Sequence, residues 1–296
     1  MEKLRNLGDR QKALLAILVG SILGGATNSV TKVGLEEIPP LTFAFLRFLL
    51  AFIIILPFII KQRKIRSLIG PLTPLSTLAS INIVMFILGI TLTTATIGQL
   101  LYSAVPLMVA IICYFFFKEI FTFKKVAGLV FGFIGVAVVI LLPVLEEGNM
   151  HSGNIIGNLL ISTGVICWAF YMAYSKNAQK SFSPFVLVSN FIFTTAVLLF
   201  PLFLFEMSYT YDWWKLITIK GIFSFLYITV ISTIFTYFLN QYAIKHGGAV
   251  LASIAFYLLP FFAFLSANIL LKEQLTPGLI GGGFLTLLGV YLVTKK

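Results

Sequence analysis

The sequence predicts an all-α integral membrane protein: ten transmembrane helices that form two inverted five-helix repeats around a central cavity. Three observations lead to this fold class: the hydrophobicity of the chain, the sidedness of its positive charge and an internal repeat. Of the 296 residues, 59% are hydrophobic and 10% are charged, whereas a soluble domain carries about 25% charged residues. Together with a mean hydropathy of +1.03, this composition excludes a soluble protein.

The apolar runs set the number of helices, because a spanning helix needs about 20 apolar residues. Ser67–Phe117 is a run of 51 residues without Asp, Glu, Lys or Arg, so it predicts two spans joined near Thr91. The apolar run that follows Lys12 is about 20 residues long and is succeeded by further spans, which favours a first helix over a signal peptide. The predicted spans are Ala13–Val33, Leu41–Ile60, Leu72–Leu92, Ala95–Phe117, Val126–Leu142, Ile155–Ser175, Phe185–Phe205, Leu216–Tyr237, Ala249–Leu271 and Pro277–Thr294.

The charged residues orient these spans. With the N-terminus in the cytoplasm, 16 of the 21 Lys and Arg residues fall on the cytoplasmic side and seven of the ten acids on the other. This asymmetry follows the positive-inside rule and predicts a multi-pass protein of the cell (inner or plasma) membrane with both termini cytoplasmic. The net charge of +11 then faces anionic lipid headgroups, so no nucleic-acid partner is expected.

The chain repeats itself. The stretches PLMVAIICYFFFKE (106–119) and PFFAFLSANILLKE (260–273) are 154 residues apart, and this register gives nine identities over 45 positions, among them prolines, glycines and charges. A register of 144 pairs Lys32 with Lys176 and Pro40 with Pro184. We therefore expect a first repeat at 1–145 (helices 1–5) and a second at 146–296 (helices 6–10). An odd number of helices per copy inverts the second, an architecture that recurs in secondary transporters.

These features resemble the EamA-type members of the drug/metabolite transporter superfamily. The resemblance rests on the ten spans, on Lys32 near the end of the first helix followed by a proline, on Arg47-Phe48-Leu49-Leu50-Ala51, and on the two Pro-x12-Lys-Glu elements with the glycine-rich helices after them. It implies a central cavity lined mainly by helices 1, 3, 4, 6, 8 and 9. It also implies small-metabolite substrates, often amino acids and usually exported.

Polar and aromatic side chains at mid-depth are the candidate substrate ligands. Buried amides and hydroxyls need partners inside a membrane, which a cavity supplies, and some of these groups will instead bond neighbouring helices. The candidates are Asn28, Asn82, Gln99, Tyr102, Ser103, Trp168, Tyr171, Tyr227, Thr233, Ser253 and Tyr257.

Two prolines are candidates for motion. Pro106 and Pro260 are predicted near the middle of helices 4 and 9, where a proline removes one backbone hydrogen bond and bends the helix. Two interpretations of these prolines remain open. Each could be a hinge that forms part of the cavity wall, or a fixed kink that serves packing.

Three charged residues complete the candidate set. Arg47 lies well inside its predicted span, where an intramembrane charge marks function unless it snorkels to the interface; a structural or gating role is favoured over substrate contact. Glu119 and Glu273 are expected at opposite membrane faces, where end-of-helix electrostatics are favoured over a gate ion pair.

The leading functional prediction is a secondary transporter that works by alternating access, an amino-acid or metabolite exporter or facilitator. No Asp, Glu or His lies in the middle of a predicted span, which favours a facilitator or exchanger over proton coupling. No Walker-type loop, catalytic constellation or metal-ligand cluster is apparent, so we expect neither an enzyme nor a cofactor. The expected partners are a small-molecule substrate and the lipid bilayer, for a monomer or homodimer.

Two alternatives remain open. Trp168, Tyr171, Tyr102 and Tyr257 could form a cation–π box for uptake of a choline-like quaternary ammonium. A lipid scramblase or a membrane enzyme is the alternative from a different class.

Overall fold

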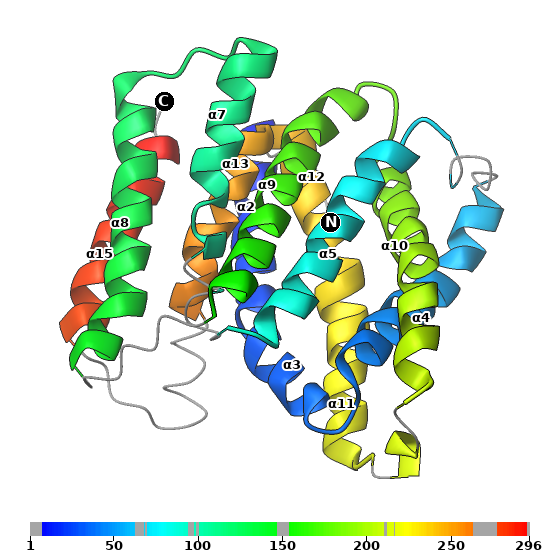
Figure 1. The fold of residues 1–296 in the computed structure, drawn as a ribbon. Coiled ribbons are helices and arrows are strands. Elements are labelled where there is room, and N and C mark those ends of the chain that lie inside the picture. Colours follow the sequence, from blue (N-terminus) through cyan, green and yellow to red (C-terminus); the bar gives the residue numbers. More distant parts are fainter. Residues whose placement is uncertain are drawn as a thin grey trace.

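The protein was analysed as a computed structural model, which describes residues 8–62, 68, 70–93, 98, 101–146, 154–209, 212–215, 217–262 and 277–294. Every regular element in these ranges is a helix (Figure 1). In chain order they are α2 Asp9–Gly25, α3 Thr27–Leu35, α4 Pro40–Lys61, α5 Thr73–Ile90, α7 Val105–Phe117, α8 Phe123–Glu146, α9 Ile155–Ala178, α10 Pro184–Met207, η2 Trp213–Lys215, α11 Ile219–Tyr227, η3 Ile228–Thr236, α12 Tyr237–Gly247, α13 Ala249–Ser253 and α15 Pro277–Thr294.

Several of these helices are long and apolar enough to cross a bilayer. Within the described residues, five helical segments meet that condition and three shorter apolar helices accompany them. The five are Pro40–Lys61, Thr73–Ile90, Ile155–Ala178, Pro184–Met207 and Ile219–Gly247; the shorter ones are Val105–Phe117, Ala249–Phe262 and Gly281–Thr294. The chain is therefore an all-helical membrane protein.

Local chemistry explains where the helices begin. Asn154 caps α9 by accepting a hydrogen bond from the Ile156 amide (2.8 Å), and Ser183 caps α10 directly before Pro184. Side-chain oxygens at this position satisfy amides that have no intrahelical partner, and proline is tolerated in the first turn because its missing N–H is not needed there. The starts of α9 and α10 thus lie within one residue of the predicted spans.

Two expectations about helix continuity are corrected. The fourth predicted span is interrupted by a turn at Ser103–Ala104, so that Pro106 lies in the first turn of α7 and not in the middle of a helix. The ninth span turns at Ile254 and resumes as a helix, with Pro260 inside that second part. The two interruptions do not coincide in the 154-residue register, because the turn immediately precedes the proline only in the first copy.

The eighth predicted span was too short. Helical structure runs without interruption from Ile219 to Gly247, 29 residues, through α11, the π-helical segment η3 and α12. The expected end at Tyr237 is wrong, and this residue lies inside the run. The charges already indicate this, because the 24 residues from Gly221 to Ile244 carry none.

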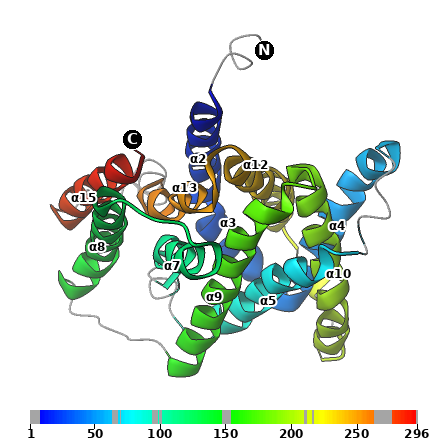
Figure 2. The same ribbon diagram turned by 90° about the horizontal axis from the view of Figure 1, so that it is seen from above.

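The helices pack in pairs. α2 lies along α12, α4 along α10, α5 along α9 and α8 along α15. Seen from above, α8 and α15 stand at one edge of the molecule, while α2 lies between α12 and α13 (Figure 2). A single large cluster of buried side chains, including Phe48, Trp168 and Phe191, joins the central helices.

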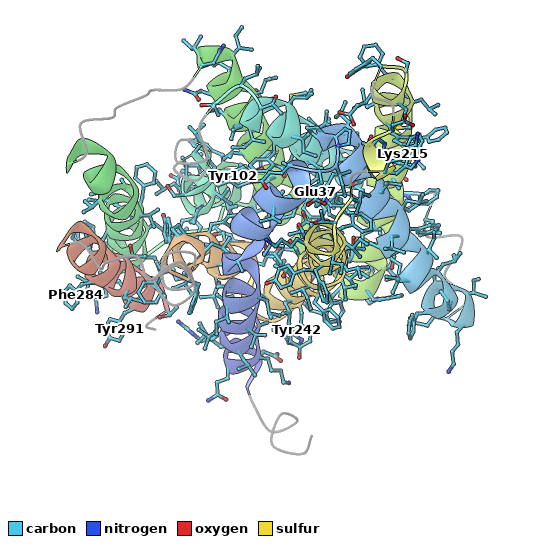
Figure 3. The ribbon with its side chains drawn as sticks, turned by 90° about the horizontal axis from the view of Figure 1, so that it is seen from below. Glu37, Tyr102, Lys215, Tyr242, Phe284 and Tyr291 are labelled. Atoms are coloured by element: carbon cyan, nitrogen blue, oxygen red, sulfur yellow. The ribbon has the colours of Figure 1, made fainter. Side chains whose placement is uncertain are left out.

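The α8–α15 pair is built on glycines. A Cβ atom placed on Gly128 would lie 2.8 Å from the Gly289 carbonyl oxygen, and one on Gly135 would lie 2.8 Å from the Gly282 carbonyl oxygen. Small residues at a helix interface let two backbones approach closely in a membrane. On the opposite side of α15, Phe284 and Tyr291 point away from the protein (Figure 3) and are 72% and 53% exposed.

Candidate substrate cavity

A cavity of about 390 Å³ lies among the central helices, within the usual size range of small-molecule sites. Its walls come from α2, α3, α5, Gly98, Tyr102, α9, η3, α12 and residues 252–259, which belong to predicted helices 1, 3, 4, 6, 8 and 9. The structure adds α4, through Pro40, Phe43 and Arg47. Among the described residues, none that lines it comes from α8, α10 or α15.

The cavity lies away from the end of the bundle at which α2 begins. On α2 the lining starts at Ala16, and on α12 it stops at Ala243. In the other direction it reaches Leu35 and Pro40 in the α3–α4 connection. The cavity therefore extends to one end of the bundle and stops short of the other.

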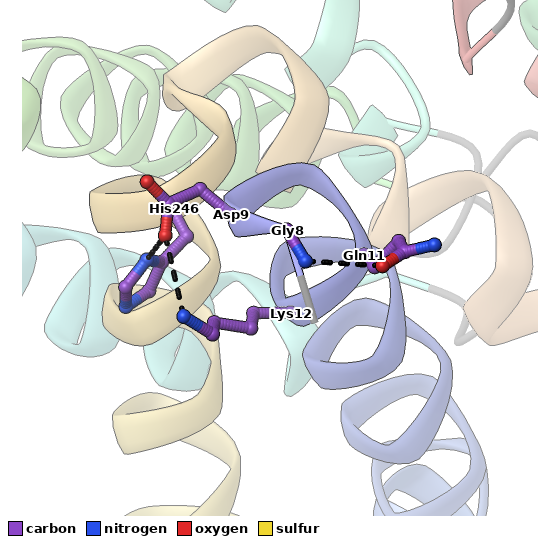
Figure 4. A network of polar contacts seen from close by, with 5 residues as sticks. All are labelled: Gly8, Asp9, Gln11, Lys12 and His246. Atoms are coloured by element: carbon purple, nitrogen blue, oxygen red, sulfur yellow. Dashed lines mark hydrogen bonds and ion pairs between the residues drawn. The ribbon is translucent and has the colours of Figure 1, made fainter. Parts of the chain in front are cut away.

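The end without cavity is closed by contacts between α2 and α12. His246 Nδ1 lies 2.9 Å from Asp9 Oδ1, and Lys12 Nζ lies 3.5 Å from the same oxygen (Figure 4). The hydrogen bond from His246 holds the pKa of Asp9 below its usual value. One turn into the bundle, a Cβ atom on Gly247 would lie 2.7 Å from that of Ala13, so α2 and α12 pack closely there.

A second set of contacts at the same end involves the C-terminal part of α9. Lys176 Nζ forms an ion pair with Glu119 Oε1 at 2.6 Å. Gln179 donates to Gln241 Oε1 on α12 (2.6 Å), and Gln241 in turn donates to Ser175 Oγ (3.1 Å). Glu119 thus pairs across to another helix, whereas its neighbour Lys118 ends α7 in the left-handed conformation, with φ 52°.

At the opposite end two carboxylates bind the first turns of helices. Glu37 accepts hydrogen bonds from the Thr218 amide (2.8 Å) and hydroxyl (2.6 Å) at the start of α11. These donors hold the pKa of Glu37 below its usual value. Glu206 on α10 accepts from the Leu41 amide (3.2 Å) and from the Thr42 amide (2.6 Å) and hydroxyl (2.8 Å) of α4. A carboxylate is favoured at a helix N-terminus by the unpaired amides and the dipole.

Of the described residues that line the cavity, Arg47 is the one that carries a charge. Its guanidinium carbon lies 4.8 Å from the centroid of the Phe48 ring, and its side chain hydrogen-bonds the Tyr237 hydroxyl. The Arg47 Nε atom is buried without a hydrogen-bond partner in the described part of the chain.

Two further lining residues carry buried polar atoms that lack a partner among the described residues, namely Trp168 Nε1 and Asn240 Oδ1. Another polar pair of the wall is satisfied internally, because Asn82 donates to the Tyr102 hydroxyl at 2.5 Å. Since buried polar atoms are nearly always paired, the three unpaired ones are candidates for a bond to a ligand or to water.

Aromatic rings form much of the remaining wall. Trp168 lies 5.7 Å from Tyr237 and 6.4 Å from Phe256, and Phe256 stacks on Tyr102 at 6.0 Å with an interplanar angle of 23°. These are favourable distances for aromatic pairs. Tyr102 is labelled among the side chains at the centre of the bundle in Figure 3.

The structure brings some of the sequence-predicted residues to the cavity and not others. Asn82, Tyr102, Trp168 and Arg47 line it. Gln99 and Glu273 lie outside the described residues, as does the side chain of Asn28. The other six candidates are not among the lining residues. Ser103 and Tyr171 are buried elsewhere in the bundle. The remaining four donate their hydroxyls to backbone carbonyls: Tyr227 to Leu23 (2.7 Å), Thr233 to Ile228 (2.9 Å), Ser253 to Val250 (2.8 Å) and Tyr257 to Leu129 (2.7 Å).

Several lining residues were missed by sequence reasoning. Tyr237 and Asn240 fell at or beyond the predicted end of the eighth span, although the uncharged run to Ile244 would have placed both at depth. The cavity-lining hydroxyls of η3 and α3 (Ser232, Thr236, Thr27 and Thr31) were not singled out, because nothing in the sequence distinguishes them from other membrane hydroxyls. The missed polar and aromatic residues are Thr27, Thr31, Phe43, Phe86, Ser232, Thr236, Tyr237, Asn240 and Phe256.

Comparison with known proteins agrees with this architecture. The chain matches the EamA-like transporter family over residues 11–141 and 155–295. It is 26% identical to an uncharacterized transporter of Archaeoglobus fulgidus (92% of this chain, 95% of the relative) and 26% identical to the uncharacterized transporter YoaV of Bacillus subtilis (96% and 97%). Over half its length it is 30% identical to the uncharacterized inner membrane transporter YedA of Escherichia coli K12 (52% and 50%).

The fold is shared with a protein of known crystal structure, with a TM-score of 0.78 at 15% identity over 95% of this chain and 96% of the other. The resemblance found in the sequence is thereby confirmed. The chain belongs to the EamA-like transporter family and is a multi-pass membrane transporter rather than an enzyme.

Proposed function

We propose that this protein moves small metabolites that carry a carboxylate, amino acids among them, across the cell membrane by alternating access. The observation that carries the proposal is the cavity itself, which is walled by aromatic rings, holds the Arg47 side chain and is closed at one end of the bundle. In alternating access, each of the two states has a cavity that is open at one side of the membrane and closed at the other, and this arrangement fits one such state.

The proposal includes two inverted halves, 1–145 and 146–296, and the glycine contacts support it. In the 154-residue register Gly128 corresponds to Gly282, and Gly135 to Gly289. The close approaches run crosswise, Gly128 to Gly289 and Gly135 to Gly282. A two-fold axis between the repeats produces this pattern. Each contact between a position of one repeat and a different position of the other then occurs a second time with the two positions exchanged.

The direction of the cavity follows from the proposed orientation. With both termini in the cytoplasm, the end closed by Asp9 and His246 is the cytoplasmic one, and the cavity faces outward. The contacts Asp9–His246 and Glu119–Lys176 then belong to the inner gate, which must separate for the inward-facing state. Pro106 lies at the start of α7, next to the turn at Ser103–Ala104 that interrupts the fourth predicted span, and is our candidate for the point of bending.

Transport is proposed to proceed without proton coupling. Among the described residues that line the cavity there is no Asp, Glu or His, and intramembrane groups of this kind usually carry protons. A facilitator or an exchanger meets this description.

Flux into proteoliposomes tests the function. Amino acids and aromatic monocarboxylates are expected to cross at a rate that a proton gradient does not change. Choline flux without carboxylate flux would support the alternative substrate, against which the positive charge of Arg47 argues. Lipid flipping with neither flux would identify a scramblase.

A further inference from the structure

We propose that Arg47 and the indole N–H of Trp168 form an anchor for a carboxylate, and that the transported molecule needs this carboxylate but no amino group. The inference rests on the proposed function and makes its substrate class narrower: aromatic or branched apolar monocarboxylates, with or without an α-amino group.

The first support is the electrostatic state of the cavity. Among the described residues, Arg47 is the charged one of the lining, and no carboxylate lies within 4.0 Å of it to form an ion pair. A buried charge without a counter-ion is unfavourable. A bound anion relieves this, and the planar guanidinium matches a carboxylate with two parallel hydrogen bonds.

The second support is the position of the free donors. Arg47 Nε and Trp168 Nε1 are both buried without an acceptor. Tyr237 connects the two residues, because its hydroxyl bonds Arg47 and its ring lies 5.7 Å from that of Trp168. In the proposed anchor, one small acceptor group between α4 and α9 accepts from donors of both helices.

The third support is the shape of the surrounding wall. The rings of Trp168, Phe256 and Tyr102 succeed one another at 6.4 and 6.0 Å, and Phe86 adds an edge contact to Tyr102 at 5.5 Å. Such a wall suits an aromatic or branched apolar body.

The amino group has a weaker counterpart than the carboxylate. Among the described residues of the cavity wall, Asn240 Oδ1 is a buried acceptor without a partner, so an ammonium can bind there, but no described lining residue offers it a negative charge. Removing the amino group from the ligand should therefore cost little affinity, whereas removing the carboxylate should abolish binding.

The test is equilibrium binding to the detergent-purified full chain. The protein has three tryptophans, and the double substitution Trp213→Phe and Trp214→Phe leaves Trp168 as the fluorescent reporter. The probes share one body: 3-phenylpropionate, L-phenylalanine, 3-phenylpropionamide and 2-phenylethylamine. We expect saturable quenching by the two carboxylates with affinities within about fivefold of each other, and at least tenfold weaker binding of the amide and the amine.

Substitutions then locate the anchor. Arg47→Gln should weaken 3-phenylpropionate at least tenfold and Arg47→Lys by less, while Lys215→Gln, an exposed charge outside the cavity, should leave it unchanged. Equal binding of the amide and the acid to the unsubstituted cavity would overturn the proposal, and this comparison does not depend on any Arg47 variant folding. So would an Arg47→Gln protein that melts normally and binds the acid as before.

Failure of the anchor and failure of the transport function give different results. Flux of amines that is independent of Arg47 would refute the anchor and leave a transporter. Carboxylate binding that Arg47 controls, without any flux in liposomes, would keep the anchor and refute transport.

Discussion

Gly289→Ala is expected to destabilise the protein, although alanine is the better helix former. The added Cβ would lie 2.6 Å from the Gly128 carbonyl oxygen and 2.7 Å from the Gly132 Cα, and it would also contact the Gly132 amide. All three are backbone atoms of α8, so no side chain can rotate away and the two helices must separate.

The magnitude follows from two opposing effects. Overpacking a tight contact costs about 1–3 kcal/mol and the lost interhelical packing adds to it, whereas replacing glycine inside a helix gains at most about 1 kcal/mol. We therefore expect Gly289→Ala to lower the free energy of unfolding by about 2 kcal/mol. Gly281→Ala on the same helix is the matched control, because its Cβ would meet nothing within 4 Å and only the propensity gain remains.

The assay is thermal unfolding of both variants in the same detergent. A difference of about 3 kcal/mol between them corresponds to roughly 6–12 °C in Tm, at about 2–4 °C per kcal/mol for a chain of this size. Ligand binding should be the same in both variants once folded, because α15 does not line the cavity. If the two variants melt within 2 °C of each other, the close approach of α8 and α15 is wrong.

Three other substitutions test contacts outside the cavity wall. Glu206→Gln should lower the free energy of unfolding by about 1.5–3 kcal/mol, because the buried carboxylate accepts charge-assisted bonds from the start of α4; an unchanged Tm would contradict this. Tyr257→Phe should cost about 1 kcal/mol through the lost hydroxyl bond to the α8 backbone, with 3-phenylpropionate affinity unaltered, and a large loss of affinity would show that this tyrosine contacts ligand after all. The Thr218 donors lower the pKa of Glu37, so its contribution is present at neutral pH and disappears as the pH falls through that depressed pKa. The Tm difference between wild type and Glu37→Gln should therefore shrink between pH 7 and pH 4, and a constant difference would refute the assignment.

Much of the fold could be predicted from apolar length alone. The helix α4 lies within one residue of its predicted span at both ends, and α10 within two, because charges and prolines bound these runs. The break before Pro106 was not predicted, since a proline is compatible both with a kink inside a helix and with the first turn of a new one. Only the tertiary fold decides between the two.

The cavity was predictable in part. Depth along a helix identified Asn82, Tyr102 and Trp168, but it cannot tell which face of a helix a side chain occupies. Tyr257 and Tyr227 have the depth and chemistry of ligand residues and instead bond backbone carbonyls of neighbouring helices. Hydrophobic periodicity gives no help here, because both the lipid-facing side and much of the cavity side are apolar.

The π-helical segment η3 has a consequence for the rotational phase of the helix that follows it. In this segment the hydroxyls of Thr233 and Thr236 bond carbonyls five residues back, as expected for a π-helix, whose turns hold more residues than those of an α-helix. Each residue of an α-helix advances the helix by about 100°. Tightening one π turn to an α turn would therefore swing Tyr237 and Asn240 by about that angle, out of the cavity wall, while α11 upstream kept its orientation. The same nine residues that contribute Ser232 and Thr236 to the wall thus also set which way the side chains of Tyr237 and Asn240 face.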